Sequence, residues 1–283
     1  MKRKIFSLFM VSVIGASCLA GCGTGSSDDS TGSTQSSPED STQTSESAAG
    51  GDYEGSLEGV TLAVGCDTSF VPFCFPDDNS DYTGFDIDLL DAFSDYLGFD
   101  YELQPMDFTA LLMSVQSGQT DMAMAGITIT EERQEVMDIS DPYYDAGLQI
   151  FVREDDDSIS QISDLEGKTI ALKEGTASVT YVNENVSDCT ITTFPNIENA
   201  YLEVQRGTAD AVVYDSPNEL YYLSQNPDCG CKVVGDLVDA CQYGVVLQKD
   251  SDYTEYINAA LAQFHEDGTY DAIYEKWFGT EAE

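Results

Sequence analysis

An α/β fold with two lobes is what the pattern of this chain predicts. Strand and helix patterns alternate in the order β-α-β-α-β over residues 60–125, and the same alternation begins again after Tyr144. This order is typical of layers in which helices cover a mostly parallel sheet, and such sheets bind ligands at the carboxyl ends of their strands. Residues 57–283 are also enough for two modest hydrophobic cores or one large one.

The first half of this region predicts three strands and two helices. Apolar and β-branched runs mark the strands, and apolar residues at helical spacing mark a helix over residues 85–97. Asp107 is the expected cap of the second helix, and Gly118 is its expected end. The expected strands are residues 60–65, 101–103 and 121–125.

The second half repeats the pattern and then adds two helices. A strand is expected at residues 169–172, after which Lys173–Ser178 turns into a helix, and residues 197–206 predict another helix. From about Tyr243 a short strand and two amphipathic helices follow, and periodicity leaves open which lobe these helices join. The remaining expected strands are residues 190–194 and 209–213.

The stretch Ala125–Arg133, with the sequence AGITITEER, predicts an anion site. Arg133 is one of only four arginines in the chain, and its planar group can grip a carboxylate with two charge-assisted bonds. Thr128 and backbone N–H groups near Gly126 would fill the remaining lone pairs. The alternative is a surface arginine that pairs with a neighbouring glutamate, since weak surface ion pairs are common.

The second half of the chain offers complementary groups. Thr176 and Ala177 open an expected helix, whose first N–H groups can also bind an anion. Asp215 lies at the expected end of a strand and would hold an ammonium group, although an aspartate before a Ser-Pro pair is also typical of a helix cap. If both lobes present their strand ends to one cleft, Arg133 and Asp215 would bind the two ends of a zwitterion.

The first 21 residues have the pattern of an export signal. A basic start is followed by an apolar run at residues 5–16 that is too short to span a bilayer. The motif LAGC then places Cys22 where bacterial lipoproteins carry their lipid, with an ordinary secretory signal as the alternative. Residues 22–56 are rich in Ser, Thr, Gly and acids and predict a disordered tether. The expected location is therefore extracytoplasmic, with the protein anchored to the cell membrane through lipid on Cys22.

Composition and motifs exclude several classes of function. The formal net charge of −41 excludes nucleic acid as a partner, because nucleic-acid binding needs a basic surface. His265 is the only histidine, and the glycine-rich motifs of hydrolases and dinucleotide-binding proteins are absent from the sequence. No cofactor or metal is expected, and six cysteines predict disulfides or free thiols whose pairing stays open. They are Cys66, Cys74, Cys189, Cys229, Cys231 and Cys241.

Five motifs resemble one family of transport proteins. They are similar to the polar amino-acid-binding proteins of bacterial ABC importers, solute-binding protein family 3, and most of all to its glutamine-binding members. The resemblance runs from Leu57 to Phe278 and implies a two-lobed periplasmic-binding-protein fold of type II, with two crossing strands between the lobes. The implied first lobe is residues 57–143 plus 244–283, and the second is residues 144–243. The motifs are AGITITEER, DTSFVPFCF, TGFDIDLL, PMDFTALL and GTYDAIYEKWFGTE.

The resemblance also implies how a ligand is held. The arginine and a threonine of AGITITEER would bind the α-carboxylate of an amino acid. Phe70 and Phe108 would flank its side chain, with closure of the hydrophobic cores as the alternative for two phenylalanines. Asp67 and Lys173 would face the end of that side chain, and an acid and a base facing one group suit a neutral amide. Glutamine is therefore expected, with arginine, histidine or cystine as the alternatives.

A lipid-anchored receptor of an importer is the function that these patterns favour. The resemblance implies a monomer that captures a free amino acid and delivers it to the membrane subunits of an ABC permease. One alternative is a dehydratase-type enzyme on the same scaffold, which would need a further acid or base in the cleft. Another is a sensor domain, which a transmembrane helix should follow, whereas this chain ends at Glu283. Two departures from the resemblance concern Cys66 and Cys74, which bracket Phe70, and Tyr214, which replaces a histidine.

Overall fold

The computed structural model describes residues 53–279 of the chain. The expected export signal, Cys22 and most of the expected tether lie outside the described residues. The folded part begins earlier than predicted, because Gly55 donates its N–H to the carbonyl of Tyr96 at 2.9 Å and Leu57 donates to that of Leu97 at 2.8 Å. Residues 53–56, which the sequence assigned to the tether, are thus held against the end of a helix.

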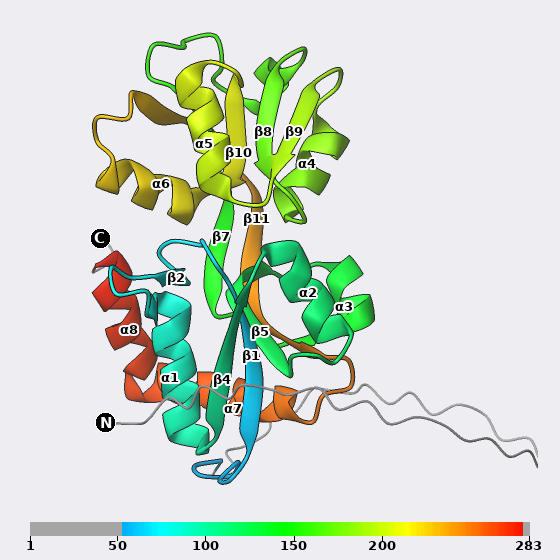
Figure 1. Cartoon of the computed structure of the whole chain (residues 1–283), viewed down its shortest axis with the longest axis vertical. Helices are drawn as coiled ribbons and strands as arrows, with labels where there is room; N and C mark the ends of the chain where they lie inside the picture. Colours follow the sequence, from blue (N-terminus) through cyan, green and yellow to red (C-terminus); the bar gives the residue numbers. More distant parts are fainter. Residues whose placement is uncertain (1–52, 280–283) are drawn as a thin grey trace, which may run out of the picture. The chain divides into compact units, whose positions relative to one another are not determined.

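One mixed sheet of nine strands runs through both lobes (Figure 1). Its strands are β1 (Thr61–Asp67), β4 (Asp100–Met106), β5 (Met122–Thr128), β6 (Met137–Ile139), β7 (Tyr144–Arg153), β8 (Thr169–Lys173), β9 (Thr190–Phe194), β10 (Ala211–Asp215) and β11 (Cys231–Gln248). Their order is β4-β1-β5-β11-β7-β10-β8-β9, with β6 paired to β11. β4, β1 and β5 pair in parallel, and so do β10, β8 and β9. The two parallel parts belong to different lobes, as the repeated pattern predicted. A separate hairpin consists of β2 (Phe75–Pro76) and β3 (Tyr82–Thr83).

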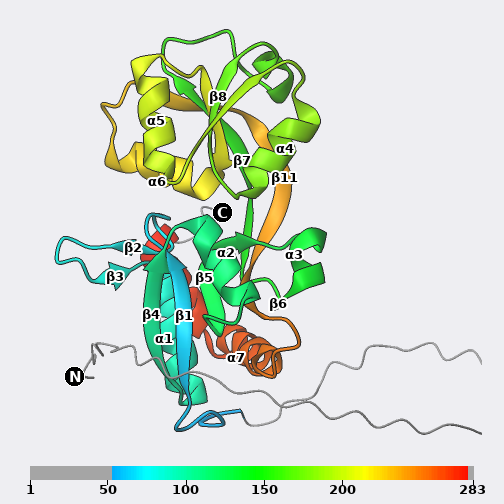
Figure 2. The same cartoon turned by 45° about the vertical axis from the view of Figure 1, so that its right-hand side comes forward.

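Helices flank the sheet in each lobe (Figure 2). The first lobe contains α1 (Phe85–Leu97), α2 (Phe108–Gln116), α3 (Glu131–Val136), α7 (Tyr253–Asp267) and α8 (Thr269–Phe278). The second lobe contains α4 (Ala177–Asn185), α5 (Ile197–Arg206), α6 (Ser216–Gln225) and the short 3-10 helix η1 (Ile162–Leu165). The rings of Phe93 in α1 and Phe264 in α7 are 5.4 Å apart, so the end of the chain returns to the first lobe. Within residues 53–279, no helix is both long and apolar enough to cross a membrane.

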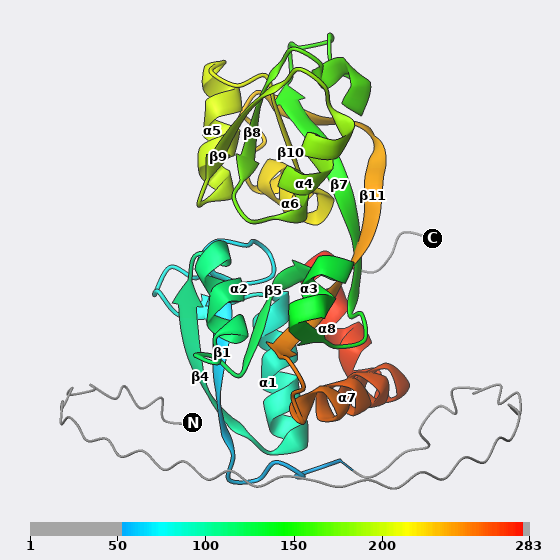
Figure 3. The ribbon, with the colours of Figure 1, turned by 90° about the vertical axis from the view of Figure 1, so that its right-hand side faces the viewer.

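Two strands connect the lobes on one side of the molecule (Figure 3). β7 and β11 pair in antiparallel fashion from Cys231 opposite Arg153 to Tyr243 opposite Tyr144. The register of β11 shifts between Val234 and Cys241, where a bulge bends the strand. This architecture confirms the predicted two-lobed α/β fold with two crossing strands.

Local sequence explains most of the elements next to the cleft. α1 has the predicted bounds, because Gly98 adopts a left-handed conformation that ends the helix. β5 is buried along its whole length, as is typical of a parallel strand covered on both faces. The cap predicted for α2 is wrong in one respect: Asp107 occupies the cap position, but its side chain makes no capping hydrogen bond.

Candidate ligand-binding site

Four parallel strands end with a polar residue at the boundary between the lobes. β1 ends at Asp67 and β5 at Thr128 in the first lobe, while β8 ends at Lys173 and β10 at Asp215 in the second. All four side chains are buried. Polar residues at this depth need partners, and the carboxyl ends of parallel strands are where α/β sheets bind ligands.

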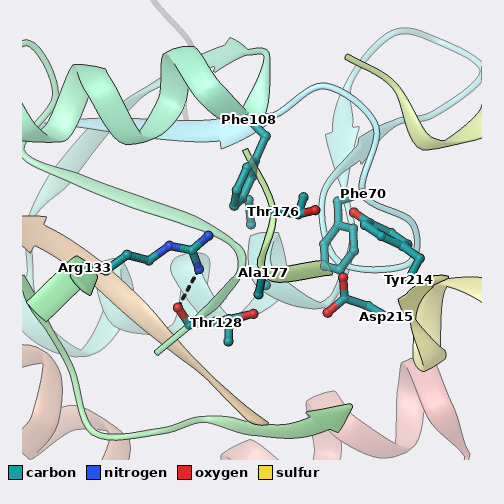
Figure 4. Close-up of a pocket in the computed structure, with 10 residues that line it drawn as sticks. Phe70, Phe108, Thr128, Arg133, Thr176, Ala177, Tyr214 and Asp215 are labelled. Carbon is teal, nitrogen blue, oxygen red and sulfur yellow. Dashed lines mark hydrogen bonds between the residues drawn. The ribbon is translucent and has the colours of Figure 1, made fainter. Parts of the chain in front are cut away.

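A small cavity of about 10 Å³ lies between the lobes, with room for about one water molecule. In Figure 4, Arg133 approaches this cavity from one side and Asp215 from the other. Eight of the ten residues predicted to bind ligand line it, together with Ala125 and Tyr214, which were not predicted. The lining residues are Phe70, Phe108, Ala125, Gly126, Thr128, Arg133, Thr176, Ala177, Tyr214 and Asp215.

The guanidinium group of Arg133 is fixed by backbone carbonyls. The hydroxyl of Thr130 caps α3 by accepting the N–H of Arg133 at 3.2 Å, which sets the start of this helix. The side chain of Arg133 then donates to the carbonyl of Thr128 at 2.6 Å and to that of Gly175, in the other lobe, at 3.3 Å. Burial lowers the pKa of Arg133, although Asp215 and Glu132 act in the opposite direction. Arg133 is therefore a partly desolvated cation facing the cleft rather than a surface ion pair.

Asp215 supplies the opposite charge on the second lobe. It occupies the cap position of α6 but makes no capping hydrogen bond, and it accepts instead from the hydroxyl of Tyr243 at 2.6 Å. Burial raises the pKa of Asp215 to about 6, against the effects of the Tyr243 hydrogen bond, Lys173 and Arg133. The hydrogen bond from Tyr243 thus fixes the carboxyl group of Asp215 beside the cavity. Asp215 does not cap α6 with its side chain, which was the alternative role.

Asp67 and Lys173 form a buried ion pair that joins the two lobes. Their side chains are 1% and 0% exposed, and the ammonium group of Lys173 donates directly to the carboxylate of Asp67. The same ammonium lies 5.9 Å from the centre of the Phe70 ring and 5.6 Å from that of Phe108. The structure therefore brings together the two residues expected at the end of a ligand side chain and the two expected to flank it, although Asp67 and Lys173 do not line the small cavity.

Gly126 has a different role from the predicted one. Its N–H donates to the carboxylate of Asp86 at 2.8 Å, so this N–H is not available to a ligand carboxylate. Its φ of +54° favours glycine, and a Cβ atom there would lie 2.1 Å from the ring of Phe70. Sequence reasoning missed Asp86, which is completely buried in α1 and whose pKa burial raises to about 7. An acid between Phe85 and Ile87, on the apolar face of α1, was the available signal.

The start of α4 completes the cavity on the side of the second lobe. Thr176 is the cap residue of this nine-residue helix, and its hydroxyl donates to the carbonyl of Lys173 at 2.8 Å. The first N–H groups of a helix have no partner within the helix, so those around Ala177 and Ser178 can donate hydrogen bonds to an anion. Within residues 53–279, no group of three or more His, Cys, Asp or Glu residues is placed to hold a metal ion.

Fold and site together define an extracytoplasmic binding protein of the two-lobed type. The chain belongs to the family described as bacterial extracellular solute-binding proteins, family 3, which matches residues 62–280. It is 30% identical over 223 residues to the L-cystine-binding protein TcyJ of Escherichia coli (strain K12). This match covers 78% of this chain and 84% of that protein.

Solved structures show the same similarity. An ancestral arginine-binding protein bound to glutamine is 43% identical, with a TM-score of 0.75, and the match covers 77% of this chain and 98% of that one. An ancestral arginine-binding protein bound to arginine is 42% identical, with a TM-score of 0.75 and coverage of 79% and 100%.

Proposed function

We propose that this protein captures a free polar amino acid between its lobes and delivers it to the membrane subunits of an ABC importer. The observation that carries the proposal is that Arg133 and Asp215, opposite in charge and on different lobes, line one cavity. An α-amino acid is a zwitterion, and two fixed charges of opposite sign match its two ends. The protein acts as a binding protein and monomer, not as an enzyme.

The carboxylate of the ligand would bind on the Arg133 side. Its oxygens would replace the carbonyls of Thr128 and Gly175 as acceptors of the guanidinium N–H groups. The hydroxyl of Thr128 and the first N–H groups of α4 would fill the remaining lone pairs. The ammonium group would bind to Asp215, whose position the hydrogen bond from Tyr243 fixes.

Glutamine is the ligand that this arrangement favours. A neutral amide can offer an NH₂ group to Asp67 and a carbonyl to Lys173, so that neither charge of the buried pair loses its partner. Glutamate would set a carboxylate against Asp67, and arginine would set a cation against Lys173, in a site that excludes water. Phe70 and Phe108, which both contact the ammonium of Lys173, would pack along the methylene groups. The similar structure bound to glutamine supports this choice, while the relatives named for arginine and cystine supply the alternatives.

Binding measurements test both the proposed capture of an amino acid and the choice of glutamine as the ligand. The full chain is titrated by calorimetry with each of the twenty amino acids and with cystine; the decisive comparison is among glutamine, glutamate, asparagine, arginine, histidine and cystine. We expect glutamine to bind at least about 100-fold more tightly than the charged ligands, a difference of about 2.7 kcal/mol. If arginine, histidine or cystine binds more tightly, the ligand assignment is wrong although the function stands. If none of the twenty amino acids nor cystine binds, the proposed function is wrong.

The membrane anchor is a separate part of the proposal. Cys22 lies outside the described residues, and its motif is the support for a lipid at this position. In a bacterial host, the protein should partition into the membrane fraction, and Cys22→Ser should move it to the soluble fraction. An unlipidated mature protein, measured by mass spectrometry, would exclude the anchor.

A further inference from the structure

Two cysteines lie together behind the loop that carries Phe70. Cys66 is the next-to-last residue of β1, Cys74 follows the loop, and the exposed fractions of their side chains are 1% and 0%. Both pack with Ile87 of α1 in one apolar cluster. The Cys66 thiol is close enough to that of Cys74 to contribute to the raised pKa of Cys74. We infer that Cys66 and Cys74 form a disulfide bond in the exported protein.

Backbone hydrogen bonds set the approach of these two residues. Phe70 donates its N–H to the carbonyl of Cys74 at 2.9 Å, and Cys74 donates its N–H to the carbonyl of Phe70 at 2.7 Å. Phe73 also donates to the carbonyl of Phe70 at 2.8 Å, which closes a tight turn. This turn brings the chain back beside the end of β1 and places the side chain of Cys74 in the same apolar cluster as that of Cys66.

The bond would enclose residues that contact the cleft and the second lobe. Asp67 binds Lys173, Phe70 lines the cavity, and the carbonyl of Val71 accepts a hydrogen bond of 2.6 Å from Asn218 in α6. A disulfide across this loop restricts the conformations that it can adopt once the lobes separate. The effect on ligand binding rests on the proposed function, whereas the bond itself does not.

Formation of the bond requires an oxidant of the disulfide class, such as oxidised glutathione or a disulfide of an exported oxidoreductase. One S–S bond forms between Cys66 and Cys74, and the S–S bond of the oxidant breaks. Two electrons and two protons pass to the oxidant, which leaves as two thiols. Extracytoplasmic compartments favour this reaction, and the family of this chain is extracellular. Burial raises the pKa of Cys74, so its thiol is a weak nucleophile in the folded state and reacts while the chain folds.

The other cysteines provide an internal comparison. Cys229 and Cys231 also lie near each other, since Cys229 contributes to the raised pKa of Cys231. Both are only partly buried, and they lie at the start of β11 rather than beside the loop that carries Phe70. Cys189 donates instead to the carbonyl of Val186 at 3.7 Å. A variant that lacks the pair Cys229 and Cys231 is therefore a matched control for one that lacks the pair Cys66 and Cys74.

Peptide mapping tests the pairing. The full chain is unfolded, refolded with a mixture of oxidised and reduced glutathione, alkylated, and digested with pepsin at low pH, where disulfides do not exchange. Cleavage after Phe70 or Phe73 separates the two cysteines, which trypsin cannot do because Lys4 and Arg133 enclose a stretch without Lys or Arg. We expect one disulfide-linked pair of peptides that contains Cys66 and Cys74 and separates on reduction. Alkylation of both residues, or a link from either to another cysteine, overturns the inference.

Stability provides a second measurement. The thermal midpoint of the chain refolded with oxidised glutathione should exceed that of the chain refolded fully reduced by about 5 °C. This difference should persist when both Cys229 and Cys231 are replaced by serine and should disappear with C66S/C74S. If C66S/C74S does not fold, the difference within the wild-type chain and its persistence in the control variant still decide the question. Equal midpoints in the two wild-type preparations overturn the inference.

Discussion

Arg133 is the residue on which the proposed site depends most. Its guanidinium group is partly desolvated, is directed at the cleft, and contacts a carbonyl of each lobe. A neutral side chain there would leave the ligand carboxylate without its main partner in a closed cleft. Such a loss typically costs about 2–5 kcal/mol, or roughly 30-fold to several thousand-fold in affinity.

Arg133→Ala should therefore abolish useful binding of whichever amino acid is the ligand. Arg206→Ala is the matched control, because Arg206 is an arginine on the surface of α5 that pairs with Glu203 of the same helix. Calorimetry should give an unchanged affinity for the control. A loss of less than threefold in Arg133→Ala would remove Arg133 from the site.

The pKa of Asp215 predicts how binding depends on pH. Burial raises this pKa to about 6 in the ligand-free protein, whereas a bound ammonium group would stabilise the charged form and lower it. Affinity should then fall by up to about tenfold per pH unit as the pH drops below about 6, and binding near pH 6 should release protons. The groups that interact with the carboxyl group of Asp215 are Tyr243, Lys173, Arg133 and the buried carboxyl group of Glu219.

Calorimetry in buffers of different ionisation enthalpy measures this proton release. Asp215→Asn should bind more weakly and lose the pH dependence near 6. Without ligand the sign is reversed: the contribution of Asp215 to folding stability is present below its ordinary pKa of 3.8 and is lost as the pH rises through about 6. An affinity that does not change between pH 5 and pH 8 would show that Asp215 does not hold the ammonium group.

At the scale of single elements, Gly126 near the end of β5 is a tightly constrained position. Gly126 allows the backbone to turn with a φ of +54° and lets the ring of Phe70 approach, while its N–H is tied to Asp86 of α1. The end of β5, helix α1 and the loop that carries Phe70 therefore all meet at Gly126. A side chain there should move Phe70 and disturb the site.

Gly126→Ala should lower the affinity at least tenfold, because the new Cβ atom would lie 2.1 Å from the Phe70 ring. Gly167→Ala is the matched control, since Gly167 has a φ of +73° but no atom within 4 Å of the added carbon. Both variants should lose about 1–2 kcal/mol of stability from the left-handed backbone conformation. Isothermal titration that gives the same affinity for both would contradict a role for the Gly126–Phe70 contact.

At the scale of the whole molecule, the contacts between the lobes describe a closed form. Lys173 binds Asp67, Asn218 binds the carbonyl of Val71, and a Cβ atom on Gly175 would lie 2.6 Å from the hydroxyl of Thr109. A cavity of about 10 Å³ is far smaller than the several hundred Å³ of a typical ligand pocket. The lobes must therefore separate before an amino acid can enter, and β7 and β11 are the strands that connect them.

Ligand binding should shift the population from open to closed forms by a hinge motion between the lobes, as is general for periplasmic binding proteins. Solution scattering should show a smaller radius of gyration with saturating ligand, because an amino acid satisfied by both lobes favours the closed state. The same ligand should leave the scattering of Arg133→Ala unchanged. Identical profiles of the wild-type chain with and without ligand would count against closure.

The sequence by itself determined the architecture and indicated the two charged residues of the proposed site. Periodicity and glycine stops are local signals, so α1, α5 and β9 have the predicted bounds. Arg133 and Asp215 could be selected because few side chains can hold a carboxylate and an ammonium, and each follows a recognisable strand.

Only the tertiary structure decided which groups meet. Asp67 and Lys173 are 106 positions apart, and the order of strands in the sheet, not local spacing, places them in contact. The same holds for Tyr214 in the cavity, and for Asp86, which takes the N–H of Gly126 that the sequence had assigned to a ligand. A hydrogen bond is decided by which partner comes within about 3 Å after packing, and packing joins segments that no local pattern relates.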